Sequence, residues 1–259
     1  PFGVNISLFP STRPLPNNDF VDVIIQEKVA AVETSGVRGP EEFAPRLKQA
    51  GVILIHKCAT VKHAIAGEKA GADAVTVVGV ENGGATGMDD VTTMVMVPLA
   101  VDAVKIPVLA GGGIGDARGL VAALALGAEG VVMGTRFMAV KESPVHPKAK
   151  EWMLRARETD TVIVERSIRN THRALRNKAA EKVLEMESKG ATLQDLLPYI
   201  GGQGAHKVYI DGDLDAGMAY CGEIVGQIND IPTCKEVIDR MVTGALAIRE
   251  RLDKICKES

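Results

Sequence analysis

Clusters of glycine follow two neighbouring apolar segments of this chain of 259 residues. Gly111, Gly112 and Gly113 end the segment IPVLAGGG, and Gly134 with Thr135 follows the segment GVVM. Glycine bares backbone N–H groups, and such groups near a helix start bind anions, phosphate above all. One glycine fits a tight turn, whereas two clusters at adjacent strand ends favour a phosphate pocket. These residues do not identify the ligand that carries the phosphate, and a flavin mononucleotide, a nucleotide and a sugar phosphate all stay open.

Lys57 is a second candidate functional group, because it ends the apolar segment VILIHK. A lysine at a strand end points into the mouth of the fold, where its charge stabilises an anionic ring. His56 precedes it, so we expect His56 to face the opposite side of the strand and to be structural. Arg136 follows the second glycine cluster and either neutralises phosphate or bridges structural carboxylates.

Apolar strands alternate with amphipathic helices through the first half of the chain. The strands are continuous apolar runs, which is typical of a parallel sheet covered on both faces. Such repeated units predict a (β/α)8 barrel, that is a TIM barrel, or a doubly wound sheet, and barrels bind ligands at the carboxyl ends of their strands. The six predicted strands span residues 2–9, 29–36, 52–59, 72–80, 106–113 and 130–138.

A barrel with eight strands would lack its first two βα units here, because the chain opens on an apolar strand. We therefore expect that an N-terminal segment has been removed. Residues 1–140 then form the ligand-binding barrel, strands 3 to 8, and residues 141–222 form an inserted helical substrate or cap domain. Residues 223–259 contain a C-terminal helix that returns to the barrel, with Thr233 as its N-cap.

Composition excludes several classes of function. The net charge of −3 with mixed signs gives no indication of nucleic-acid binding, and no apolar run has the length of a membrane span. Four cysteines without paired spacing predict reduced thiols of a cytoplasmic protein and neither disulfides nor a metal site. Whether the chain forms a homo-oligomer is left open.

Long ordered motifs give the chain a family resemblance. The segments PFGVN, ENGGATGMDD, ESPVHPKAK and the whole run from Ile106 to Ala139 resemble the nitronate monooxygenase family, formerly called 2-nitropropane dioxygenases. The resemblance is strongest to a bacterial branch that includes NADH:quinone reductases. It implies an FMN-dependent (β/α)8 barrel with a helical substrate domain, lacking two N-terminal βα units that carry part of the flavin site.

The same resemblance assigns roles to individual residues. It implies a flavin site in which the isoalloxazine or ribityl chain contacts Asn5 and Lys57, the flavin lies against Gly83 and Gly84, and the phosphate is held by Gly111, Gly112, Gly113, Gly134 and Thr135. Ala85 occupies the place of the family's catalytic histidine, and alanine cannot take a proton. The catalytic residue is therefore unassigned, with His206 and Tyr220 of the cap as candidates that the sequence does not place.

Three functional hypotheses follow. The first is a flavin oxidoreductase. Since no catalytic base is assigned at the carboxyl ends of the strands, the simplest chemistry is hydride transfer from NADH or NADPH to FMN and on to a quinone or a similar small-molecule acceptor. Nitronate monooxygenation and flavin-dependent enoyl reduction are the alternatives within the family.

The second hypothesis is a barrel that binds a nucleotide or sugar phosphate without flavin, since the glycine region also resembles inosine monophosphate dehydrogenases. Those enzymes need a nucleophilic cysteine, and Cys58 lies in the wrong context. The third is a non-enzymatic, open barrel whose exposed sheet edge needs a partner segment.

Overall fold

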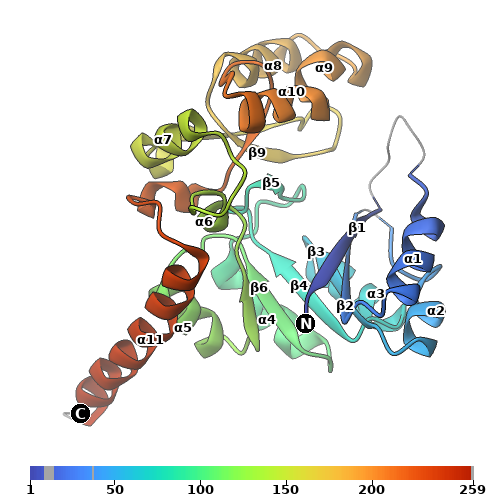
Figure 1. Cartoon of the computed structure of the whole chain (residues 1–259), viewed down its shortest axis with the longest axis vertical. Helices are drawn as coiled ribbons and strands as arrows, with labels where there is room; N and C mark the ends of the chain where they lie inside the picture. The colour runs from blue at the N-terminus through green and yellow to red at the C-terminus, as the bar shows by residue number, and fades with distance from the viewer. Residues whose placement is uncertain (9–14, 37, 258–259) are drawn as a thin grey trace.

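The computed structural model describes residues 1–8, 15–36 and 38–257. Its main feature is a parallel sheet of six strands in the order β1-β2-β3-β4-β6-β7, which is also their order along the chain (Figure 1). The strands are β1 Gly3–Ser7, β2 Ala31–Ser35, β3 Ile53–Cys58, β4 Ala74–Val78, β6 Val108–Gly111 and β7 Gly130–Val132. A strand lies within each of the six predicted ranges, although residue 9 of the first lies outside the described residues. The last strand is shorter than the predicted 130–138, because residues 135–138 form a short helix.

Helices follow the strands, as in a (β/α) barrel. They are α1 Asn17–Gln26, α2 Ala44–Gln49, α3 Val61–Lys69, α4 Thr93–Ala103, α5 Ala117–Ala125 and the C-terminal α11 Cys234–Lys257. Among the described residues the sheet has β1 and β7 at its two edges and forms a half-barrel. The barrel-type fold expected from the sequence is confirmed.

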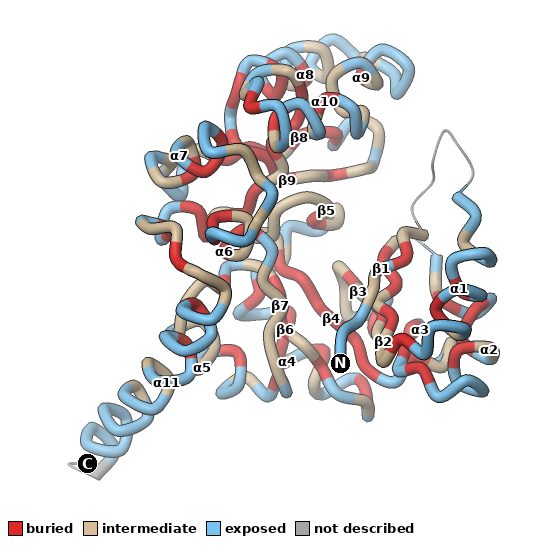
Figure 2. Tube along the Cα trace, in the orientation of Figure 1, coloured by how far each residue is buried: buried red, intermediate tan, exposed pale blue. Residues whose placement is uncertain are grey.

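The sheet separates an apolar face from a polar one. Ile6, Val32 and Leu54 alternate onto the helix side, where they join a buried cluster with residues of α1 and α2 (Figure 2). Asn5 and Glu33 are paired across β1 and β2 on the opposite face, which is the interior of the half-barrel. Because side chains alternate along a strand, the interior face keeps polar groups available at the mouth.

The cap follows β7 and contains short strands in addition to the helices that the sequence suggested. It contains α6 Thr135–Met138, α7 Pro147–Arg155, α8 Lys178–Ser188, α9 Leu193–Ile200 and α10 Gly202–His206. Between them run β8 Thr161–Val164, β9 His172–Leu175 and β10 Ala219–Tyr220, and β9 also pairs with β5 Gly84–Ala85 of the barrel. Short single-turn helices span Glu158–Asp160, Lys207–Asp211 and Glu223–Gln227. The prediction missed these strands because each has only two to four residues.

The antiparallel pairing of β5 with β9 joins the cap to the barrel. Figure 1 shows α8, α9 and α10 standing above β5, on the side where the sheet strands end. Arg173 of β9 strengthens this junction, because its Nε donates to the carbonyl of Val80 at 2.8 Å. The same guanidinium lies 2.8 Å from Glu223 Oε1 in an ion pair.

The C-terminal helix α11 starts where the sequence predicts. The Thr233 Oγ1 accepts from the Glu236 N–H at 3.1 Å, which is the contact of an N-cap residue. Val237 and Met241 of α11 are buried in the cluster that also contains α4 and α5 residues. Gly244 allows the close approach of α5, because a Cβ built on it would lie 2.6 Å from the Ala117 Cβ.

Two classes of feature are not found in the part of the chain that the structure describes. No helix there is both long and apolar enough to cross a bilayer. No group of three or more His, Cys, Asp or Glu side chains within these residues is arranged to hold a metal ion.

The contact between α11 and α5 predicts the effect of Gly244→Ala. Alanine ordinarily stabilises a helix interior relative to glycine by about 1 kcal/mol, but here the methyl overpacks the interface, at a cost of about 1–3 kcal/mol. We therefore expect a lower free energy of unfolding in urea. Gly202→Ala is the matched control, since its Cβ meets no atom within 4 Å. Equal stability of both variants would contradict the packing argument.

Candidate functional site

A cavity of about 100 Å³ lies at the carboxyl ends of β4, β6 and β7. It is lined by the predicted glycines together with the cap, namely Glu81, Asn82, Gly83, Gly112, Gly113, Ile114, Val132, Met133, Gly134, Thr135, Met138, Tyr220, Gly222 and Ile224. Five of the nine predicted cofactor residues therefore meet in one place. The two glycine clusters are separated by residues 114–133 in sequence but adjacent here, because β6 and β7 are neighbouring strands.

The glycines of this cavity are of two kinds. Gly112 and Gly113 have φ of +93° and +70°, a backbone region that favours glycine. A Cβ on Gly134 would meet no atom within 4 Å, so the space beside it is open. These residues expose main chain to the cavity, as an anion site requires.

Gly111 and Gly83 serve packing instead. A Cβ on Gly111 would lie 2.9 Å from Val78 Cγ1, and Gly111 is buried at the strand end rather than on the cavity wall. A Cβ on Gly83 would lie 2.6 Å from the Gly222 N, so this glycine admits the returning cap backbone. Gly84, with φ of +75°, meets nothing within 4 Å and pairs with Arg173 of β9.

The helix that begins at the cavity is α6 and not α5. The N-terminus of α5 is capped by Asp116, whose Oδ1 accepts from the Arg118 N–H at 2.8 Å. Gly115, Asp116 and Arg118 line a different cavity, between α5 and α11. The short helix α6 begins at Thr135 in the glycine cavity, so its first turn supplies the helix start.

The cap closes over the cavity through backbone hydrogen bonds. Gly222 N–H donates to Thr135 Oγ1 at 2.9 Å, and Glu223 N–H donates to the Glu81 carbonyl at 3.0 Å. The Glu81 carboxylate, although it lines the cavity, accepts from the Thr93 N–H at 3.0 Å and from the Thr93 hydroxyl at 3.1 Å. Its charge therefore faces the N-terminus of α4, which disperses it.

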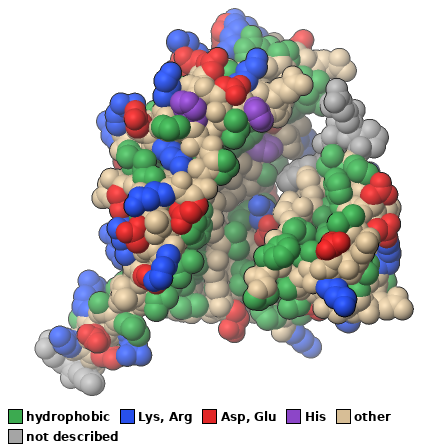
Figure 3. Space-filling model, in the orientation of Figure 1, with side chains coloured by type: hydrophobic (Ala, Val, Ile, Leu, Met, Phe, Trp, Pro, Cys, Tyr) green, Lys and Arg blue, Asp and Glu red, His purple; other side chains and the backbone are tan. Residues whose placement is uncertain are grey.

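A second hollow, of about 310 Å³, lies at the ends of β2, β3 and β4 under the cap. Lys57 and Ala85 line it, together with Ser35, Cys58, Val78, and Arg169, Asn170 and Thr171 of the cap. Figure 3 shows the molecule hollowed beneath the overhanging cap, with charged and histidine side chains at its edge. Lys57 is half-buried and is paired across β2 and β3 with Ser35.

Asn5 lies further along the interior face. Its Nδ2 donates to Glu33 Oε2 at 3.1 Å and to Ser35 Oγ at 3.3 Å, and Asn5 is not among the residues lining either the glycine cavity or the hollow. The same Glu33 accepts from Thr76 Oγ1 at 3.1 Å. The polar interior face is therefore continuous from β1 to β4.

His56 faces away from the interior, as expected for alternating side chains. Cys58 lies at the end of the same strand and packs in the buried core cluster, although it also borders the hollow. His56 Nδ1 lies 2.9 Å from Thr34 Oγ1, and burial lowers its pKa. Cys58 is buried, and the loss of solvation raises the pKa of its thiol to about 12. A thiol with so high a pKa is a poor nucleophile, which argues against cysteine chemistry at this strand end.

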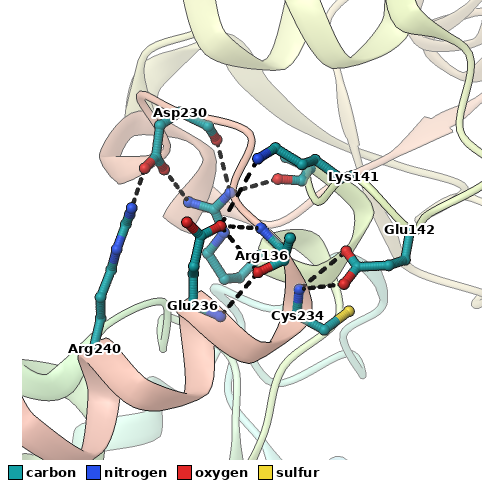
Figure 4. Close-up of polar contacts among 9 residues, drawn as sticks. Arg136, Lys141, Glu142, Asp230, Cys234, Glu236 and Arg240 are labelled. Atoms are coloured by element: carbon teal, nitrogen blue, oxygen red, sulfur yellow. Dashed lines mark hydrogen bonds and ion pairs between the residues drawn. The ribbon is translucent and has the colours of Figure 1, made fainter.

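Arg136 bridges structural groups, which settles the alternative that the sequence left open. Its guanidinium lies 3.2 Å from Asp230 Oδ1 and donates to the carbonyls of Ala139 and Asp230 at 2.6 and 2.8 Å (Figure 4). Arg240 of α11 joins the same Asp230 carboxylate. This network ties the segment after β7 to the start of α11 and does not line the glycine cavity.

The sequence reasoning missed a polar cluster in the cap. Glu165 Oε1 accepts from the Tyr220 hydroxyl at 3.0 Å, and its Oε2 accepts from Asn170 Nδ2 at 2.6 Å and lies 3.5 Å from His172 Nδ1. Burial raises the pKa of Glu165. Tyr220, one of the two predicted cap candidates, belongs to this cluster, whereas His206 is exposed on α10.

Comparison with known proteins places this geometry in a family. Residues 5–244 match the family described as nitronate monooxygenase. A (3aS,4S,5R,7aS)-5-hydroxy-7a-methyl-1-oxo-octahydro-1H-indene-4-carboxyl-CoA dehydrogenase of Rhodococcus jostii is 34% identical over 98% of this chain and 80% of its own. A probable nitronate monooxygenase of Staphylococcus aureus is 39% identical, over 64% of this chain and 49% of its own. The solved structure of FabK from Thermotoga maritima superposes with a TM-score of 0.90 at 38% identity, covering 98% of this chain and 79% of that one.

The thiols give a testable consequence of the site's electrostatics. Burial raises the pKa of Cys58 and of Cys221 to about 12, which leaves each with about 10³-fold less thiolate than an ordinary cysteine at neutral pH. We expect the exposed Cys256 to react rapidly with Ellman's reagent and these two only slowly. The rapid phase should vanish in Cys256→Ser. Rapid labelling of Cys58, read by peptide mass spectrometry, would reopen the cysteine-based hypothesis.

Proposed function

Because the chain belongs to the nitronate monooxygenase family of flavin-dependent oxidoreductases, we propose that it binds FMN and passes a hydride from NADH or NADPH to a small-molecule acceptor. The acceptor that we favour is a quinone or another electron-poor carbonyl compound. The observation that carries this proposal is the glycine cavity, whose open main chain at Gly113 and Gly134 suits the phosphate of FMN.

The arrangement of the two cavities supports FMN over a smaller phosphate ligand. The glycine cavity is about 100 Å³ and sits beside the larger hollow of about 310 Å³, with Gly83 lining the first and Ala85 lining the second. A mononucleotide has a polar tail and a flat ring system, and two such neighbouring spaces suit these two parts. Lys57 and Asn5 would then face the ring or its ribityl chain from the interior of the sheet, as the resemblance implies.

Lys57 gives the site its electrostatic function. A half-buried ammonium at the strand end stabilises negative charge that develops on an electron-accepting ring, and it does so more effectively than in water because the site has a lower dielectric constant. The flavin would supply the redox chemistry, and the chain supplies position and charge.

An acyl thioester is the second candidate acceptor. The Rhodococcus jostii relative is named as acting on a carboxyl-CoA compound, and it is 34% identical over nearly the whole chain. Nitronate oxidation is the third candidate reaction, since the family is described by it. Ala85, however, occupies the position of the family's catalytic base and cannot accept a proton. A cytoplasmic location and the oligomeric state stay predictions.

One experiment tests the proposed function. The purified protein is saturated with FMN, and anaerobic stopped-flow absorbance follows flavin reduction by NADH and by NADPH. The reduced protein is then mixed with menadione, with enoyl-CoA thioesters or with propyl nitronate. We expect a nicotinamide to reduce the flavin and a conjugated carbonyl compound to reoxidise it. Reduction by the nitronate alone, with neither nicotinamide active, would show that the proposal is wrong.

Gly134 provides a matched pair of variants for the phosphate cradle. Its Cβ position is open, so Gly134→Ala should keep FMN affinity, whereas Gly134→Asp places a carboxylate beside the phosphate. Like-charge repulsion predicts FMN binding that is roughly 10- to 100-fold weaker for the aspartate variant. Flavin fluorescence titration measures both dissociation constants. Equal dissociation constants for the alanine and aspartate variants would show that the phosphate does not bind in this cavity.

A further inference from the structure

Ala85, at the family's histidine position, is paired with the cap. Strands β5 and β9 are antiparallel, and Ala85 lies directly opposite His172. Opposite residues in such a pair project to the same face, with Cβ atoms about 4.5–5.5 Å apart. An imidazole carried by residue 172 therefore reaches the space that an imidazole on residue 85 would fill. The methyl group of Ala85 leaves that space free.

The imidazole of His172 is held in one orientation. Its Nδ1 lies 2.5 Å from the carbonyl oxygen of Asn170. A carbonyl oxygen only accepts hydrogen bonds, so Nδ1 carries the proton, and Nε2 is the atom left to exchange protons. The side chain is 18% exposed, which gives it access to water while most of its surface is covered.

A buried carboxylate supports this imidazole. Glu165 Oε2 lies 3.5 Å from Nδ1, and the Glu165 side chain is 2% exposed. Tyr220 and Asn170 both donate to the carboxylate, which fixes its position. Glu165 also has φ of +65°, a strained conformation that costs about 1–3 kcal/mol and that clusters at functional sites. This contact positions the imidazole ring of His172.

The cluster lies between the two cavities of the site. Asn170, Thr171 and Ala85 line the larger hollow, and Tyr220 lines the glycine cavity. The ring centroids of His172 and Tyr220 are 5.1 Å apart. His172 itself lines neither cavity; it follows Thr171 in sequence and pairs with Ala85, and both of these residues line the larger hollow.

From these contacts we propose that His172 is the proton donor of the reaction, supplied by the cap in place of a histidine at position 85, with Glu165 as its positioning residue. The inference rests on the proposed function and concerns acceptors that must be protonated on carbon. The alkene of an enoyl thioester receives a hydride at its β carbon, with electrons that come from NAD(P)H through the flavin. It receives the Nε2 proton at its α carbon, so the π bond is replaced by two C–H bonds. The imidazole then regains a proton from water.

The test separates proton donation from hydride supply. FMN in the holoprotein is reduced with dithionite, so the result does not depend on whether a nicotinamide is the natural donor. Reoxidation is then followed with crotonyl-CoA, with a longer enoyl-CoA and with menadione, whose oxygens take protons directly from water. His172→Ala should slow enoyl-CoA turnover about 10²- to 10³-fold, which is the usual contribution of a general acid, and change menadione turnover less than about threefold.

Two further variants distinguish a proton donor from a merely structural residue. In His172→Ala/Ala85→His the imidazole returns from the opposite strand, and we expect at least a tenfold recovery of enoyl-CoA turnover. His206→Ala, which removes an exposed histidine from the same cap, should leave all rates unchanged. Circular dichroism checks that each variant is folded.

Nitrogen NMR of the flavin-free protein gives a readout independent of activity. His172 should show a protonated Nδ1 and an unprotonated Nε2 at high pH, and Glu165→Gln should shift this preference toward a mixture of tautomers. The inference is overturned if His172→Ala reoxidises with enoyl-CoA at the wild-type rate, or if the wild-type protein reoxidises with menadione but with no enoyl-CoA. It is also overturned if the enoyl-CoA and menadione rates fall together. Failure of NADH and NADPH to reduce the flavin would instead contradict the proposed function.

Discussion

The site depends on the close approach of two backbone segments, the loop after β4 and the returning cap segment before the last helix. Gly83 and Gly222 make this approach, because a Cβ on Gly83 would lie 2.6 Å from the Gly222 nitrogen. The Gly222 N–H is satisfied by Thr135 Oγ1, at the start of α6. Three elements that are far apart in sequence therefore meet at one point, and the glycine cavity is the space that they enclose.

The polarity of the site follows from the alternation of side chains in a parallel sheet. Residues such as Val32 and Leu54 are buried against the helices, which fixes the register of each strand. Glu33, next to Val32, and Lys57, an odd number of residues after Leu54, are thereby directed to the interior of the half-barrel. A one-residue slip would bury these charges, so the stability of the core also determines the chemistry of the mouth.

The sequence was sufficient for the features that depend on local patterns. Continuous apolar runs identified the six strands, glycine clusters identified the cavity, and Thr233 identified the start of α11. It was insufficient where short segments pair over long distances. Strands β5 and β10 have two residues each, too few for a periodic signal. For the same reason Arg136 stayed ambiguous, since its partner Asp230 is 94 residues away.

The role proposed for His172 shows why a missing residue in a motif is weak evidence for a missing function. The space at a strand pair is filled from either strand, so the chemical group that a reaction needs is specified by position and not by sequence order. The pairing of His172 with Ala85 becomes apparent only in the folded chain. The small side chain at position 85 and the imidazole at position 172 are then parts of one arrangement, because two rings on opposite residues would compete for the same volume. Burial and a positive φ both make the conformation of Glu165 energetically unfavourable. Its contact with His172 explains why a carboxylate is held there.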